Sequence, residues 1–93
     1  MVITRARIDG DFDQFWDTFR TKGSELRAEF GSRGARAYRD EDDPREIWVV
    51  LDMDRADFER FLQDPRLPEI MKQAGLAAPP EPFYVEPIGE TAG

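Results

Sequence analysis

The sequence contains neither cysteine nor histidine, and these two absences exclude several kinds of site. Without cysteine the chain has no disulfide, no thiolate nucleophile and no thiolate metal ligand. Without histidine, Ser24 and Ser32 have no imidazole base to activate them, so a Ser-His-Asp mechanism is impossible. Any general acid–base chemistry therefore falls to carboxylates or tyrosines whose pKa values are shifted by their surroundings.

Basic residues and long apolar runs are also scarce. The chain carries 13 basic against 20 acidic residues, for a net charge of −7. That charge repels a phosphate backbone and offers no basic patch to anionic lipid, so neither nucleic acid nor a membrane is an expected partner. No segment approaches the roughly 20 apolar residues of a transmembrane helix. Residues 1–7 lack the apolar core of a signal peptide, and we expect a cytoplasmic protein.

Signatures of cofactors and metal ions are missing as well. No glycine-rich loop of the kind that binds nucleotide phosphates occurs in the chain. The alternating aspartates in residues 9–13 resemble the start of a calcium loop, but Gln14 takes the required glycine position and Arg20 the position of the bidentate acid. The acidic run Asp40–Asp43 precedes a proline and is typical of a solvated turn. We expect no cofactor and no metal site.

What the 93 residues do contain is enough for one small domain. They are 40% hydrophobic and include 7 Phe, 2 Trp and 2 Tyr, which supply bulky core material. We expect a single domain over residues 1–88 and a flexible C-terminal tail over residues 89–93.

Hydrophobic periodicity divides the domain into strands and helices. Strands are predicted at residues 2–8, 33–39, 47–53 and 83–85, and helices at 12–30 and 55–74, the second broken at Asp64-Pro65. Asp11 is predicted to cap the first helix, whose apolar stripe includes Gly23 and indicates a close approach to the sheet or a kink. The order β-α-β-β-α-β predicts an α+β, ferredoxin-like antiparallel sheet with both helices on one face.

In the run Ile47–Leu51 every side chain is apolar, so a strand formed by these residues would have apolar side chains on both of its faces. A strand with one wet face alternates apolar and polar residues, so this strand is expected to be covered on both sides. The chain's own helices cover one side. A second copy is the simplest cover for the other, so a homodimer is predicted.

Strand parity assigns side chains to the two faces of the sheet. Ile47, Val49 and Leu51 are predicted to pack on the helices. The opposite face is predicted to carry Ile3, Arg5, Arg7, Arg36, Tyr38, Trp48, Val50, Asp52, Tyr84 and Glu86. Two interpretations of this face remain open: Arg5 and Arg7 pair with carboxylates such as Asp52 or Glu86, or they hold an anionic ligand.

The element order, the aromatic stripe of the first helix and the segment Asp64–Gly75 resemble the dimeric α/β-barrel superfamily, which includes antibiotic-biosynthesis-monooxygenase-like proteins. The resemblance implies a homodimer in which two sheets face each other with the helices outside. Haem-binding members rely on a histidine that this chain lacks. Cofactor-free quinol oxygenases have aromatic cavity residues, for which Trp16, Tyr38 and Trp48 are loose counterparts, but the asparagine of those enzymes has no match here.

These observations lead to one expected function and two alternatives. We expect a homodimer that binds a small planar or anionic molecule, with Arg5, Arg7 and Arg36 holding the anionic group. Trp48, Tyr38 and Tyr84 are expected to stack on the apolar ring of the ligand. One alternative is a cofactor-independent monooxygenase acting on an aromatic polyketide or quinol. The other is a structural or interaction dimer without a ligand pocket.

Overall fold

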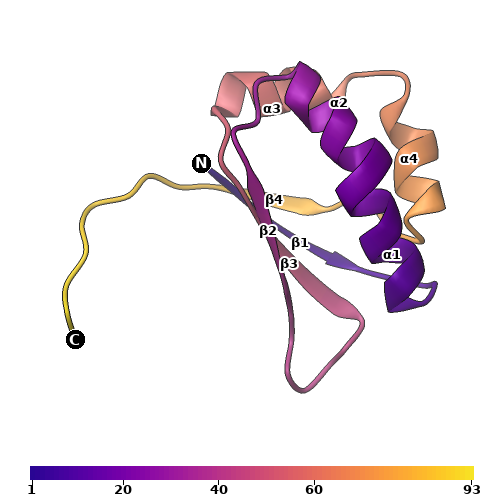
Figure 1. Cartoon of the computed structure of the whole chain (residues 1–93), viewed down its shortest axis with the longest axis horizontal. Coiled ribbons are helices and arrows are strands. Elements are labelled where there is room, and N and C mark those ends of the chain that lie inside the picture. Colours follow the sequence, from indigo (N-terminus) through magenta and orange to yellow (C-terminus); the bar gives the residue numbers. More distant parts are fainter.

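The computed structural model of the chain describes residues 1–93. Its strands form one antiparallel sheet in the order β2-β3-β1-β4, and all helical segments lie together on one side of it (Figure 1). The strands are β1 (Val2–Arg7), β2 (Ala35–Arg39), β3 (Glu46–Leu51) and β4 (Glu81–Tyr84). The predicted α+β, ferredoxin-like architecture is therefore confirmed.

The first helix runs continuously over residues 12–29 in three parts. These are α1 (Phe12–Thr18), a π-helical turn η1 (Phe19–Gly23) and α2 (Ser24–Glu29). It begins where predicted, because the backbone N–H of Gln14 donates to the Asp11 carboxylate at 2.7 Å. It ends at Gly31, whose φ of +84° lies in the left-handed region that favours glycine.

The second helix is broken as predicted into α3 (Arg55–Leu62) and α4 (Leu67–Gln73). The α4 segment ends in a Schellman motif, in which the N–H of Leu76 donates to Met71 O and the N–H of Gly75 to Lys72 O. The α4 segment also contacts the first helix, since the Gln14 side chain donates to Gln73 O at 2.8 Å. Gln14 thus links the first helix to α4 by a hydrogen bond.

The hydrophobic core lies between the sheet and the helices. Its twelve buried hydrophobic residues come from every helix and from the helix-facing parity of β1 and β3: Val2, Ile8, Phe15, Leu26, Ile47, Val49, Leu51, Met53, Phe58, Phe61, Leu67 and Ala74. Along β3 burial alternates strictly, with Ile47, Val49 and Leu51 buried and the residues between them only partly so. The predicted division of β3 into two faces is confirmed.

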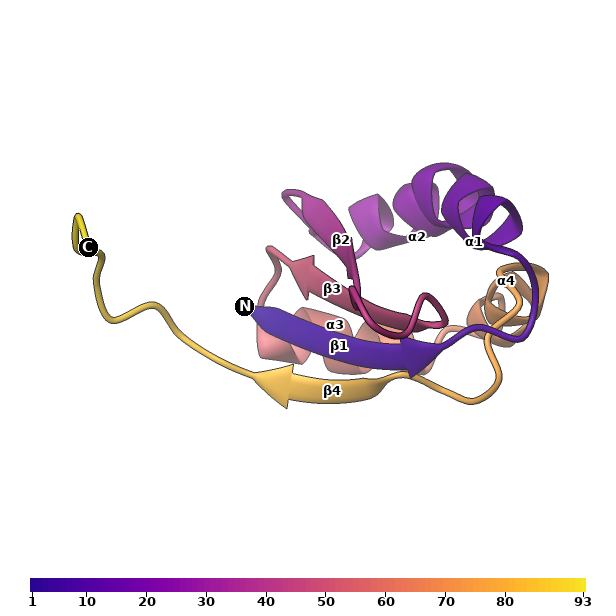
Figure 2. The same cartoon turned by 90° about the horizontal axis from the view of Figure 1, so that it is seen from below.

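The other face of the sheet carries no helix, and we call it the open face (Figure 2). It consists of Ile3, Arg5 and Arg7 on β1, Arg36 and Tyr38 on β2, Glu46, Trp48 and Val50 on β3, and Glu81 and Phe83 on β4. The predictions for the residues within β1, β2 and β3 agree with this arrangement, whereas two further residues predicted for this face lie outside the strands: Asp52 follows the end of β3 and Glu86 follows the end of β4.

Strand β4 departs from its prediction. It pairs with β1 so that Tyr84 lies opposite Val2 and Phe83 opposite Ile3. Val2 is fully buried on the helix side, and Tyr84 contacts Phe58 there, edge to face, with ring centroids 6.2 Å apart. The assignment of Tyr84 to the open face is wrong. Phe83 and Tyr84 are both aromatic, so their sequence does not show which of them points to the helices, and only the pairing of β4 with β1 decides it.

Beyond β4, residues 85–93 have no regular structure and run away from the body of the domain (Figure 1). The backbone N–H of Val85 still donates to Met1 O, whereas the Ile88 side chain is fully exposed. No helix is long and apolar enough to serve as a bilayer-spanning segment.

Candidate functional site: a cavity between the sheet and the helices

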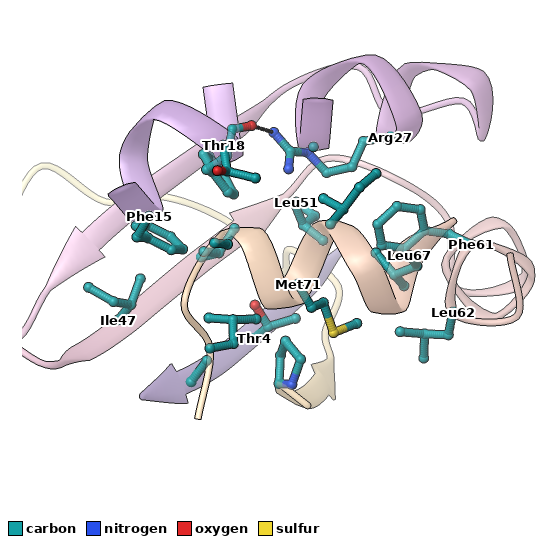
Figure 3. A pocket seen from close by; sticks show the side chains of 18 of the residues that line it. Thr4, Phe15, Thr18, Arg27, Ile47, Leu51, Phe61, Leu62, Leu67 and Met71 are labelled. Carbon is teal, nitrogen blue, oxygen red and sulfur yellow. Dashed lines mark hydrogen bonds between the residues drawn. The ribbon is translucent and has the colours of Figure 1, made fainter. Parts of the chain in front are cut away.

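A cavity of about 100 Å³ lies inside the core, between the sheet and the helices (Figure 3). We call it the core cavity. Of its 19 lining residues 14 are hydrophobic, and none is acidic. Phe15 and Phe61 form parts of the helical wall, while Ile47, Val49 and Leu51 come from β3. The cavity lies on the face of the sheet opposite to the one where the sequence placed a ligand.

The only charged side chain that lines the core cavity is Arg27 of α2. It is 7% exposed, and no carboxylate lies within ion-pair distance of its guanidinium. One Nη donates to Phe19 O at 2.8 Å, and the guanidinium stacks over the Phe19 ring at 4.0 Å. Burial lowers the pKa of Arg27 to about 10, so the side chain is still charged at neutral pH.

The π-helical turn η1 shapes the wall beside Arg27. A π-turn changes the hydrogen-bond pattern of a helix and is frequent at functional sites. Here Phe19, at the start of the turn, offers its carbonyl to Arg27, and Gly23 ends the turn directly against the same guanidinium. A Cβ at position 23 would lie 2.9 Å from an Arg27 Nη and 3.2 Å from Thr18 O. The glycine therefore leaves the space that the arginine occupies.

Two threonines complete the polar part of the core cavity. Thr4, on β1, is 6% exposed, and its hydroxyl makes no side-chain hydrogen bond. Thr18, on α1, donates only a long hydrogen bond to Gln73 O at 3.4 Å. Figure 3 shows Thr18 and Arg27 on the helical side of the cavity and Thr4 on the sheet side. A ligand in the cavity would therefore meet polar groups on both walls.

An open groove of about 890 Å³ adjoins the core cavity. It runs along α4 and the segment that leads to β4, and it includes Asp9 and Lys72 at its rim. Five residues line both spaces: Leu62, Leu67, Met71, Leu76 and Pro80. The core cavity is therefore partly open, and it adjoins the groove along these apolar residues.

The open face holds an aromatic cluster. Trp48 lies opposite Tyr38 in the β2–β3 pairing and stacks against Phe83 with ring centroids 6.5 Å apart. The guanidinium of Arg5 sits over the Trp48 ring at 5.6 Å. Tyr38 is 52% exposed and Phe83 39%. Large aromatic side chains with this much exposure are typical of a surface that another molecule covers.

The arginines of β1 on this face are engaged by carboxylates. Arg5 pairs with Glu46 at 2.6 Å, and Arg7 pairs with Asp43 at 2.6 Å and with Glu46 at 3.1 Å. The hydrogen bond from Arg7 holds the pKa of Asp43 below its ordinary value. Pairing was one of the two predicted interpretations, but within the chain the partners are Glu46 and Asp43 in place of Asp52 or Glu86, and Asp52 pairs with Arg33.

The structure brings five of the six predicted ligand residues to one face, and Tyr84 is the exception. Tyr84 packs under Arg55, whose guanidinium lies 4.0 Å from the tyrosine ring. Arg36 makes no ion pair, so it is the least engaged arginine of the set. Trp16 lies on neither face of the sheet and stacks on Phe19 along the first helix.

Sequence reasoning missed Arg27, although the sequence contains a signal for it. Leu26 and Phe30 belong to the apolar stripe of the first helix, and Arg27 follows Gly23 by one turn, at the edge of that stripe. An arginine at such an edge usually extends its head group to solvent. The sequence does not show that the head group instead turns inward to the Phe19 carbonyl.

No protein-family model matches the sequence, and no curated protein is significantly similar to it. Solved structures do share its fold. A protein from Bordetella bronchiseptica that is described with the antibiotic biosynthesis monooxygenases superposes with a TM-score of 0.70, at 20% identity, over 94% of each chain. SnoaB, a cofactor-independent oxygenase from Streptomyces nogalater, superposes with a TM-score of 0.70, at 16% identity, over 94% of this chain and 92% of its own.

A third structure, from Chloroflexus aurantiacus and described with the same group, has a TM-score of 0.62 at 19% identity. It covers 99% of this chain, and this chain covers 96% of it. The sequence resemblance to the antibiotic-biosynthesis-monooxygenase-like fold is thereby confirmed. At these identities the likeness establishes the fold, and the chemistry has to be argued from the residues of this chain.

Proposed function

Because the chain shares the fold of antibiotic-biosynthesis-monooxygenase-like proteins, we propose that it binds a small, largely apolar molecule in the core cavity. The observation that carries the proposal is the apolar space of about 100 Å³ inside a 93-residue core. Native interiors contain few voids larger than a water molecule, and an empty cavity weakens the core around it. A ligand that fills the space restores those contacts, and the adjoining groove provides its way in.

The proposal is tested with toluene as an apolar probe and with a variant that fills the cavity. Ala6, on β1, lines the core cavity, whereas Ala28 lies exposed on α2. We expect toluene to shift the methyl NMR signals of Leu51 and Met71 in the wild type and in Ala28→Leu, but not in Ala6→Leu. If toluene leaves the wild-type signals unchanged, the cavity does not take apolar ligands.

We further propose that the protein is a homodimer joined through the open face. The aromatic cluster on that face supports this, as do the half-buried Ile3 and Val50 beside it. A two-fold axis would bring each cluster onto its counterpart, which is the self-complementary arrangement of a C2 dimer. The ion pairs of Arg5 and Arg7 neutralise the charges that such a contact would bury.

The ligand role predicted for the open face is kept as a second proposed site, between the two sheets of the dimer. Arg36 is the arginine most available to an anionic ligand there, because it makes no ion pair. Trp48 and Tyr38 provide aromatic rings on the same face. Arg5 and Arg7 would first have to leave their carboxylate partners. For this reason we place the principal site in the core cavity.

A second candidate function is a cofactor-independent oxygenase acting on an aromatic polyketide or quinol, and it is favoured by the shared fold with SnoaB. An apolar enclosure with one buried cation suits this chemistry, since it stabilises the electron-rich phenolate form of a substrate. The test is oxygen consumption with a panel of hydroquinones, compared between the wild type and Ala6→Leu. Turnover that Ala6→Leu abolishes supports an enzyme; its absence across the panel leaves a binding protein.

A further inference from the structure

We propose that Arg27 binds an anionic oxygen of the ligand, a carboxylate or a phenolate carried on a small apolar ring. The inference rests on the proposed binding function of the core cavity and names the class of molecule that the cavity selects. It concerns a residue on the helix side of the sheet, distinct from the arginines of the open face.

The first argument is the unbalanced charge of Arg27. A guanidinium has five N–H donors, and here the protein supplies one acceptor, Phe19 O, together with the Phe19 ring on which the group stacks. The other N–H groups are not fully enclosed and keep room for a further acceptor. No carboxylate compensates the buried charge, a situation that is costly unless another group provides the negative partner. The remaining N–H groups form a planar fork whose geometry matches a carboxylate.

The second argument is the charge balance within the cavity compared with the rest of the protein. The chain as a whole carries a net charge of −7, and carboxylates pair with most arginines at its surface, Arg33 and Arg66 among them. The lining of the core cavity contains no acidic residue and one arginine. A small anion is therefore attracted at that one place, while a cation is repelled there.

The third argument is size. An engineered protein cavity of about 150 Å³ accepts benzene. The core cavity, at about 100 Å³, is on the scale of a single aromatic ring, and the neighbouring groove of about 890 Å³ can hold further substituents. The unpartnered hydroxyl of Thr4, on the sheet side, is available to a second polar group of the ligand.

The test compares two probes of the same shape, benzoate and neutral benzamide, by titration against three proteins. These are the wild type, Arg27→Met, and Arg20→Met as a control that removes the same charge from an exposed ion pair with Asp17. We expect the wild type and Arg20→Met to bind benzoate about tenfold more tightly than benzamide, as a charge-assisted hydrogen bond predicts. Arg27→Met should lose this preference and keep its affinity for benzamide.

A second measurement needs no variant. A guanidinium beside a bound phenol stabilises the phenolate, so binding of para-nitrophenol to the wild type should lower the pKa of the phenol and increase the yellow absorption of its phenolate at fixed pH.

The two proposals can fail separately. Equal affinities for benzoate and benzamide in the wild type, or a benzoate preference that survives in Arg27→Met, would overturn the anion assignment and leave the cavity a neutral binding site. If neither benzoate, benzamide nor toluene binds, the proposed function fails as well. Arg27 would then act only within the helix, as the hydrogen-bond partner of the Phe19 carbonyl.

Discussion

The arginines on the two faces of the sheet differ in whether a carboxylate neutralises their charge. On the open face, Arg5 and Arg7 are half-exposed and each is held by a carboxylate at 2.6 Å. On the helix side, Arg27 is buried, faces an apolar cavity and has no carboxylate partner. A charge that is already neutralised is suited to being covered by another protein surface, whereas a buried charge without a partner is suited to a ligand. The contrast separates an interface from a binding site on a single sheet.

The largest expected effect compares one aromatic side chain from each face. Phe58 is 3% exposed in the core and Phe83 is 39% exposed on the open face. Phe58→Ala should lower the free energy of unfolding by about 3–5 kcal/mol, the usual cost of deleting a buried aromatic ring. Phe83→Ala should cost well below that at protein concentrations where the chain is monomeric. Urea unfolding measures both, and equal losses would mean that the two faces are buried to the same degree within one chain.

Trp48→Asp tests the open face as an interface. A charge placed at the centre of the aromatic cluster should weaken dimerisation by about 2 kcal/mol or more, the range of an interface hot spot. Sedimentation velocity at micromolar concentration should show a dimer for the wild type and a monomer for the variant. Ile88→Asp, in the exposed C-terminal segment, adds the same charge and should leave the dimer intact. A wild-type protein that sediments as a monomer contradicts the assignment.

Thr4→Val tests the polar wall of the core cavity opposite Arg27. Thr4 is 6% exposed and its hydroxyl makes no side-chain hydrogen bond, but the oxygen itself is not fully enclosed. Replacing it should therefore raise the free energy of unfolding only slightly, by about 1 kcal/mol at most. Thr21 is the matched control, since its exposed hydroxyl donates to Asp17 O at 2.6 Å and Thr21→Val should bring no gain. Thermal unfolding distinguishes the two variants. A destabilised Thr4→Val would show that the hydroxyl has a partner in solution.

The sequence was sufficient to predict the fold because its local signals agree with the long-range pairing. The cap at Asp11 and the break at Asp64-Pro65 occur where the sequence indicates them, and the two helices end within one residue of the predicted positions 30 and 74, next to Gly31 and Gly75. Each depends on a residue type with a strong conformational preference. The face assignment on β3 succeeded for the same reason, since strict alternation follows once a strand of that length is placed.

The site was harder to predict, because tertiary contacts decide it. The direction of the Tyr84 side chain depends on the register between β4 and β1. Because Phe83 and Tyr84 are both aromatic, their sequence does not indicate which of the two faces the core. The inward turn of Arg27 depends on the π-helical turn and on Gly23, and neither follows from helical periodicity. The core cavity itself arises from the way several elements fail to fill a volume, which no single segment of the sequence encodes.

The smallest expected effect concerns the ion pair of Arg7 and Asp43 on the open face. The pKa of Asp43 is lowered, first by the hydrogen bond from Arg7, so the pair stabilises the fold above the ordinary carboxyl pKa of about 3.9 and loses that contribution as the pH falls through the lower folded-state value. Arg7→Met should therefore raise the pKa of Asp43 toward the ordinary value. The pKa of Asp64, which Arg66 lowers separately, should stay where it is. Carboxyl NMR titration measures both groups. If the pKa of Asp43 does not change in Arg7→Met, Arg7 does not pair with Asp43 in solution. Arg7 would then be available, like Arg36, to bind an anionic ligand on the open face.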